Sequence, residues 1–226
     1  MKASDREQED RLCRELATDL DGSFPRLVVA FQGRLYAFAL RLTGSPRDAE
    51  EIAQDAFIRA YRALRGYPEE RVRGMVLKSW LYQITLNVAR NQLRRRHPAT
   101  VSLDQEGDNA PASLPDDDSR GPEALFQRAE ERNQLAGLVA TLPERYRAAV
   151  VLRHVSGLSY AEVADILKQP AGTTKANVHR GIQLLRARLA EQGLVDHNEW
   201  RHDDGKAESI IAVHGAATSR RTPRSR

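Results

Sequence analysis

The residues from 142 to 189 constrain the fold more than any other part of this 226-residue chain. Helical patterns follow one another there, and turn signals separate them; the first pattern ends at Ser156-Gly157. Ser159 stands three residues before Glu162, which is the spacing of a capping box at the start of a helix. Apolar residues then recur at helical intervals, at Tyr160, Val163, Ala164 and Leu167. This spacing predicts a short amphipathic helix.

A second helix is predicted after a break, because Gln169-Pro170-Ala171-Gly172 is a poor continuation of the first. Thr173 is its predicted N-cap. The predicted inward face holds Thr174, Val178, Ile182 and Leu185, and the predicted outward face holds Lys175, Ala176, His179, Arg180 and Gln183. A helix, a tight turn and a helix with a basic outer face fit the major groove of DNA. A bent pair of surface helices without DNA binding is the alternative.

Charge is distributed unevenly along the chain, whose formal net charge is +4. Residues 23–96 carry +8, residues 97–122 carry −5 and residues 123–195 carry +3. Two basic segments joined by an acidic one indicate two contacts with a polyanion. Residues 97–122 are rich in Pro, Asp and Ser and have no periodicity, so we expect them to form a flexible acidic linker.

Several classes of site have no support in the sequence. Cys13 is the only cysteine, which excludes a disulfide within the chain and a cysteine-rich zinc site. His197, His202 and His214 are irregularly spaced in a predicted tail and do not indicate a metal site. No phosphate-binding, dinucleotide, zinc-protease or hydrolase motif occurs, so we expect no catalytic residues, metal or cofactor. Neither a signal peptide nor a membrane span is visible, which predicts a cytoplasmic protein.

The N-terminal half shows a helical stripe of apolar residues from 24 to 42, which Gly44 ends. Ser45 and Pro46 then mark a new helix start. The buried face of this second helix is predicted to comprise Ala49, Ile52, Ala53, Ala56, Phe57, Ala60 and Leu64. Its exposed face offers Glu51, Gln54 and Asp55. An acidic patch within a basic segment indicates a binding surface; a solvated helix face is the alternative.

A further helix is predicted over residues 77–96, with a core stripe at Leu77, Leu81, Ile84 and Val88. One flank carries Trp80, Asn87, Asn91 and Arg94, and the helix ends in Arg94, Arg95 and Arg96. Amides pair with base edges, arginines bind phosphate or guanine, and aromatic rings stack on bases, so this flank is suited to nucleic acid. Arginines also favour the negative end of a helix, but that alternative leaves the asparagines unexplained.

Two sequence stretches together resemble bacterial RNA polymerase sigma factors of the extracytoplasmic function (ECF) group. DAEEIAQDAFIRAYRAL (48–64) followed by WLYQITLNVARNQLRRR (80–96) resembles sigma domain 2, and residues 142–189 resemble sigma domain 4. The resemblance implies an all-α fold of two small helical domains, at 24–96 and 123–190, joined by the linker at 97–122. Outside the resemblance, residues 1–23 alternate in charge and are expected to form a frayed helix or a tail, and residues 191–226, where the helical pattern decays, a disordered C-terminal tail.

The resemblance also implies the function of a sigma factor, which binds core RNA polymerase, recognises promoter DNA and starts strand opening. Glu51, Gln54 and Asp55 would face the polymerase. Trp80, Asn87, Asn91 and Arg94–Arg96 would contact the downstream (−10) promoter element, and Thr173, Lys175, Ala176, Asn177, His179 and Arg180 the upstream (−35) element. An anti-sigma factor is an expected partner.

This chain departs from the family pattern at several positions in the second stretch. Lys168 stands where family members usually have Gly, Thr174 where they have Val or Ile, and Ala176-Asn177 where Ser-Arg is frequent. The turn and the set of base-reading residues are therefore expected to differ. The alternative reading of the whole chain is a stand-alone helix-turn-helix regulator with an N-terminal sensor or dimerisation domain.

Overall fold

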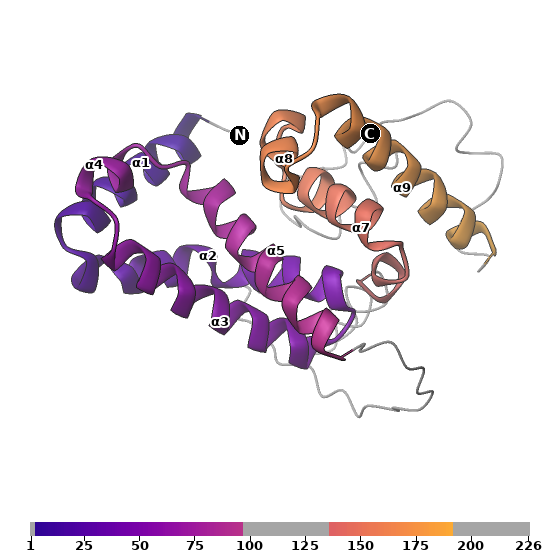
Figure 1. Ribbon diagram of the computed structural model, residues 1–226, viewed down its shortest axis with the longest axis horizontal. Coiled ribbons are helices and arrows are strands. Elements are labelled where there is room, and N and C mark those ends of the chain that lie inside the picture. The colour runs from indigo at the N-terminus through magenta and orange to yellow at the C-terminus, as the bar shows by residue number, and fades with distance from the viewer. Residues whose placement is uncertain (1–2, 97–135, 192–226) are drawn as a thin grey trace, which may run out of the picture.

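The computed structural model describes residues 3–96 and 136–191, and within these ranges all regular secondary structure is helical. This confirms the predicted all-α fold. Figure 1 shows the N-terminal helices together on one side of the molecule and the C-terminal helices on the other, with α5 facing the second group. Among the described residues, no helix combines the length and the apolar character that crossing a membrane requires. The predicted linker (97–122) and all of the predicted C-terminal tail except Glu191 lie outside the described residues.

The N-terminal body consists of α1 (Ala3–Thr18), α2 (Leu20–Thr43), α3 (Pro46–Arg65), α4 (Glu69–Arg73) and α5 (Leu77–Arg96). Gly44 ends α2 in the left-handed region, with φ at 73°, and its N–H donates to the carbonyl oxygen of Leu40. Ser45 caps α3 by accepting from the N–H of Asp48, and Pro46 occupies the first turn. Both helix boundaries predicted from Gly44, Ser45 and Pro46 are confirmed.

The core of this body is built from the apolar stripes predicted in α2, α3 and α5. The α2 stripe is buried at Leu27, Phe31, Leu35, Phe38, Ala39 and Leu42, and every predicted α3 core residue is buried. In α5, Leu77, Leu81 and Val88 are buried, whereas Ile84 is partly buried and packs against the core. Tyr82 and Leu86, outside the predicted stripe, are buried as well, since α5 packs on α2 and α3 and also on the C-terminal body.

The N-terminal segment forms a packed helix, in place of the frayed helix or tail expected over residues 1–23. Helix α1 packs against α2 and α4 and buries Leu12, Cys13 and Leu16 in the core. The alternating charges hid this contact in the sequence, because the three buried residues form only a narrow stripe among charged neighbours. Asp19 then caps α2 by accepting a hydrogen bond from the N–H of Gly22.

The C-terminal body consists of a helical turn at 136–140, α7 (Glu144–Val150), a π-helical segment η1 (Val151–Val155), α8 (Tyr160–Leu167) and α9 (Ala171–Glu191). The π segment was not predicted; its wider turn lets the N–H of Ser156 reach the carbonyl of Val151, 2.9 Å away. Gly157, at φ 65°, then turns the chain toward α8.

The start of α9 differs from the prediction. Thr173 was the expected N-cap, but the helix begins at Ala171, and the carbonyl of Pro170 already accepts from the N–H of Thr174. Proline supplies a φ suited to a helix start and needs no N–H partner there, so Pro170 begins the helix earlier than a threonine cap would. Thr173 therefore lies exposed within the first turn of α9.

Candidate polymerase and nucleic-acid interfaces

The acidic face of α3 is exposed as predicted. Glu51 and Gln54 are exposed and Asp55 is partly exposed, on the side of the helix away from the buried stripe. Glu51 accepts a hydrogen bond from Nε2 of Gln92 on α5 at 3.0 Å and pairs with Arg47. Asp55 pairs with Arg59 one turn on. These contacts are surface contacts of low energy, which a partner can replace.

Ile58 lies on the same face and was missed by the sequence reasoning. It is a large apolar side chain with 49% of its surface exposed, seven residues after Glu51. Two helical turns separate these positions, so their side chains share a face. The sequence did contain a signal for it, because Ile58 is apolar but does not fit the spacing of the buried residues of α3. An apolar residue ringed by polar ones is typical of the centre of a protein interface.

The predicted DNA-binding flank of α5 is formed, but its members are not equally accessible. Asn87, Arg94 and Arg95 are exposed, and Asn91 is partly exposed. Arg94 donates from Nη2 to Oδ1 of Asn91 at 2.6 Å, which holds both side chains on one surface. Trp80 is partly buried with its ring 6.1 Å from that of Tyr67, so it also packs against the core of the N-terminal body. Arg96 ends the helix.

Helices α8 and α9 form the predicted helix-turn-helix. Ser159 and Glu162 make both bonds of the capping box at the start of α8, and residues 168–170 connect the two helices. The predicted inward residues of α9, Thr174, Val178, Ile182 and Leu185, are all buried. The predicted outward residues Lys175, Ala176, His179, Arg180 and Gln183 are all exposed. The local sequence signals thus predicted which face of α9 is available.

Two residues in and after the turn, Lys168 and Asn177, have structural roles in addition to any contact with DNA. Asn177, predicted to contact DNA, is partly buried and donates from Nδ2 to Oε1 of Gln169. Lys168 caps α8 with φ at 54°, and it is the one non-glycine residue at positive φ within the described ranges. Lys168 thus stands at a left-handed position where the family usually has glycine, and glycine adopts this conformation without steric cost.

The orientation of α9 is set by close contact with α7. A Cβ added to Gly181 would lie 2.4 Å from Cγ2 of Val150 and 3.3 Å from Cβ of Tyr146. Both distances are shorter than ordinary van der Waals contact between carbon atoms. Only a hydrogen at position 181 lets the two helices approach this closely.

Polar contacts join the two bodies. Arg147 of α7 is half-buried and donates to the carbonyl of Leu42 at the end of α2 and to that of Leu142. Burial lowers the pKa of Arg147, an effect that nearby Glu144 opposes.

A second contact between the bodies involves the capping box of α8. Ser79 of α5 donates to Oε1 of Glu162 at 3.4 Å. Partial burial disfavours the charge of Glu162, but the hydrogen bonds from Ser159 and Ser79 and the charge of Lys78 outweigh it and lower its pKa.

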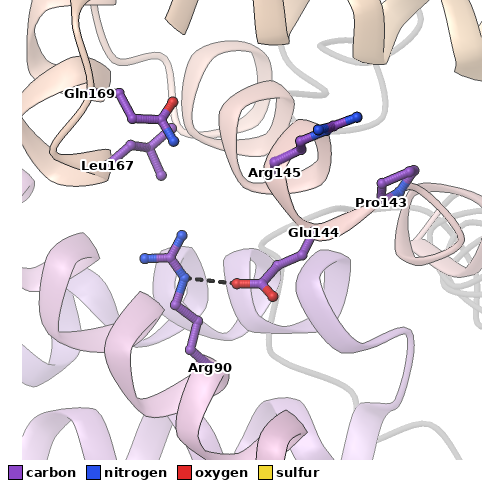
Figure 2. Close-up of a pocket in the computed structure, with 6 residues that line it drawn as sticks. All are labelled: Arg90, Pro143, Glu144, Arg145, Leu167 and Gln169. Carbon is purple, nitrogen blue, oxygen red and sulfur yellow. Dashed lines mark hydrogen bonds and ion pairs between the residues drawn. The ribbon is translucent and has the colours of Figure 1, made fainter. Parts of the chain in front are cut away.

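A pocket of about 420 Å³ lies between the bodies (Figure 2). It is lined by Arg90, Pro143, Glu144, Arg145, Leu167 and Gln169. Figure 2 shows Arg90 extending from the N-terminal body toward Glu144, and its Nε lies 2.9 Å from Oε1 of that carboxylate. No cluster of three or more His, Cys, Asp or Glu suited to a metal ion occurs in the described part of the chain.

Comparison with known proteins decides the family. The family model for Sigma-70 region 2 matches residues 27–98, and the model for Sigma-70, region 4 matches residues 132–185. The ECF RNA polymerase sigma factor SigW of Bacillus subtilis is 31% identical over 173 residues, which cover 75% of this chain and 90% of SigW. The chain belongs to the ECF group of sigma-70 family sigma factors.

Other relatives agree with this assignment. RNA polymerase sigma-H factor of Pseudomonas aeruginosa is 31% identical over 187 residues, which cover 79% of this chain and 92% of that protein. SigE of Mycolicibacterium smegmatis is 35% identical over 170 residues, which cover 75% of this chain but only 62% of SigE. CnrH, solved in complex with the cytosolic domain of CnrY, shares the fold with a TM-score of 0.57 at 23% identity, over 81% of this chain and 97% of CnrH.

As an ECF sigma factor, the protein binds core RNA polymerase and directs promoter-specific initiation of transcription. A stand-alone regulator with a sensor domain is not favoured, because the region 2 model covers most of the N-terminal body. Family membership establishes the function of the whole chain, but it does not establish the roles of individual residues on α3, α5 and α9.

Proposed function

We propose that three exposed surfaces perform the three binding steps of initiation. Glu51, Gln54 and Asp55 on α3, with Ile58 among them, contact core polymerase. A carboxylate-rich surface on a body that is otherwise basic discriminates between partners, since it repels DNA and attracts a basic protein surface. The hydrogen bond between Glu51 and Gln92 places this surface beside the C-terminal half of α5, so polymerase and DNA would bind next to each other.

The flank of α5 is proposed to bind the −10 element and to start strand opening. Asn87 and Asn91 offer amides for base edges, Arg94, Arg95 and Arg96 offer cations for the backbone, and Trp80 offers an aromatic edge. The bond from Arg94 to Asn91 orients the amide before DNA arrives. Such preorganisation lowers the entropy lost on binding.

The outer face of α9 is proposed to read the −35 element through Lys175, Ala176, His179 and Arg180, with Thr173 at the start of the helix. The observation that carries this assignment is the complete separation of faces on α9. The side opposite the buried residues carries only exposed small, polar or basic residues, and it follows α8 across a three-residue turn. Asn177 supports this face through the turn residue Gln169, and its role in DNA binding is proposed to be indirect.

The remaining properties follow from this function. The protein is proposed to act without catalysis of its own and without a metal or cofactor, in the cytoplasm, where chromosome and polymerase are found. CnrH was solved with the cytosolic domain of CnrY, and the sigma factor RpoE with the anti-sigma factor NepR from Bartonella quintana, so an anti-sigma factor is proposed for this chain too.

Run-off transcription with core polymerase and a genomic promoter library tests the assignment. The wild-type protein should give discrete transcripts. Asn87→Ala with Asn91→Ala, and Lys175→Ala with Arg180→Ala, should each lose those transcripts while the proteins still co-purify with core polymerase. If either pair of substitutions leaves the transcript pattern unchanged, the corresponding surface has been wrongly assigned.

A further inference from the structure

The contact between Arg90 and Glu144 involves a residue of the proposed −10 surface that sequence reasoning did not single out. Asn87, Arg90, Asn91 and Arg94 are spaced 3, 1 and 3 residues apart, so their side chains share one face of α5. Nε of Arg94 also approaches the carbonyl oxygen of Arg90, at 3.4 Å. Arg90 thus stands between the two asparagines and extends the cationic part of that face.

In this structure the guanidinium of Arg90 faces a carboxylate from the other body. Its Nε lies 2.9 Å from Oε1 of Glu144, in the first turn of α7 (Figure 2). The side chains of Arg90 and Glu144 are 31% and 60% exposed, so the ion pair lies at the rim of the pocket and not in a core. A solvated pair of this kind is weak and can exchange partners readily.

A carboxylate and a DNA phosphate offer a guanidinium the same chemistry, namely anionic oxygens that accept N–H bonds. We propose that Arg90 binds a phosphate of the −10 strand, and that Glu144 occupies the position of that phosphate while the two bodies are in contact. The carboxylate thereby competes with DNA for one cation of the −10 surface. This inference rests on the proposed role of the α5 flank.

The other contacts between the bodies stabilise helix ends, whereas the ion pair of Arg90 and Glu144 does not. Arg147 satisfies carbonyls at the ends of two helical segments, and Glu162 is part of the capping box of α8. Glu144 forms no side-chain cap on α7, and its carboxylate points across the pocket to Arg90. Its neutralisation removes one favourable charge from the first turn of α7, and breaks no cap or carbonyl contact between the bodies.

The experiment measures binding of the full-length protein to a fluorescein-labelled single-stranded DNA 20-mer of mixed sequence, at several salt concentrations. Glu144→Gln keeps the shape of the side chain and should tighten binding by up to about fivefold, the upper limit set by the strength of an exposed ion pair. The salt slope should steepen, and Arg90→Gln should weaken binding and make the slope shallower. The two changes in slope should together amount to about 0.7, the value for one phosphate contact on a single strand, because Glu144 and DNA compete for the same cation.

Two comparisons separate competition from a general effect of charge. Glu69→Gln removes a carboxylate that pairs with Arg73 on α4, away from the pocket, and changes the net charge equally. It should change binding far less than Glu144→Gln. In addition, Glu144→Gln should have no effect in a protein that already carries Arg90→Gln. An equal effect of the two carboxylate substitutions, or a gain that persists without Arg90, would overturn the proposal.

One further variant distinguishes failure of this inference from failure of the proposed function. Asn87→Ala with Asn91→Ala removes the amides of the same surface. If that variant loses binding while Arg90→Gln does not, the −10 surface stands and the role of Arg90 is refuted. If neither variant changes binding, the assignment of the α5 surface fails, and the inference fails with it.

Discussion

Asn177 donates a hydrogen bond from Nδ2 to Oε1 of Gln169, 3.0 Å away, and thereby ties helix α9 to the turn that precedes it. Asn177→Ala should lower the free energy of unfolding by about 0.5–1.5 kcal/mol, the usual contribution of one such bond. Urea denaturation measures this loss, and Gln169→Ala should show little additional loss in the same protein. A variant with wild-type stability but impaired −35 binding would instead identify Asn177 as a direct DNA contact.

Lys168 adopts the left-handed backbone conformation at the end of α8, and this conformation is costly for any residue with a Cβ. Lys168→Gly should therefore raise the free energy of unfolding by about 0.5–1 kcal/mol, after the greater flexibility of glycine in the unfolded chain is deducted. Lys168→Ala removes the same charge and keeps the Cβ, so it should not stabilise the protein. Equal stability of the two variants in urea would contradict a backbone cost.

The acidic face of α3 can be tested without disturbing the fold, because its ion pairs with Arg47 and Arg59 are solvated. Glu51→Arg with Asp55→Arg should abolish co-purification with core polymerase and change the free energy of unfolding by no more than about 1 kcal/mol. The matched control is Glu69→Arg with Glu70→Arg, which makes the same charge change on exposed positions of α4. Retention of polymerase by the α3 variant would refute the assignment.

On α9, loss of a phosphate contact and loss of a base contact should have different signatures. Arg180→Ala should weaken binding to all sequences and reduce the salt slope by about 1, as expected for one phosphate. His179, whose ring nitrogen lies 3.0 Å from Nε2 of Gln183, should affect only base preference. His179→Ala should relax selection at one or two positions of the −35 element in a randomised-site binding assay. Unchanged preference in that assay would exclude His179 as a base contact.

Cys13 provides a pH-dependent measure of how firmly α1 is packed. Burial, with smaller contributions from Asp10 and Glu9, raises the pKa of its thiol from 9.0 to about 11. The folded state therefore favours the protonated thiol, and its contribution to stability is complete below pH 9 and declines as pH rises toward 11. Iodoacetamide at pH 8 should leave the folded protein unmodified and label it after unfolding in urea. Cys13→Ala should show a smaller decline in stability between pH 9 and 11, and the decline that remains reflects tyrosines such as Tyr36 and Tyr82, whose pKa values burial also raises.

Local signals predicted a large part of this fold. The cap at Ser45, the capping box at Ser159 and the end of α2 at Gly44 depend on residues close together in sequence, and the structure confirms all three. The exposed face of α9 was equally predictable, because a strict apolar period marks its opposite side. These signals place helices and their faces, and they carry little information on how one body meets another.

The missed features depend on distant partners. The stripe in α1 acquires meaning only when α2 and α4 cover it, and Tyr82 was overlooked because it packs on Phe38 of α2, away from the predicted stripe of α5. The sequence gives no reason to single out Arg90, because its partner Glu144 lies on α7, far away in the chain. The prediction for Thr173 was wrong for a local reason, since this good capping residue follows three residues after Pro170, which starts the helix earlier.

If α9 reads the −35 element as proposed, the contact of Gly181 with Val150 and Tyr146 separates two determinants of promoter preference. Under the role proposed for α9, the chemistry of its exposed side chains would select which base edges can be bound, whereas the tilt of α9 against α7 would select which base pairs those side chains reach. A methyl group at position 181 would push α9 away from Val150 and shift every contact of the outer face together. Promoter preference could thus diverge between related proteins through a residue that never touches DNA.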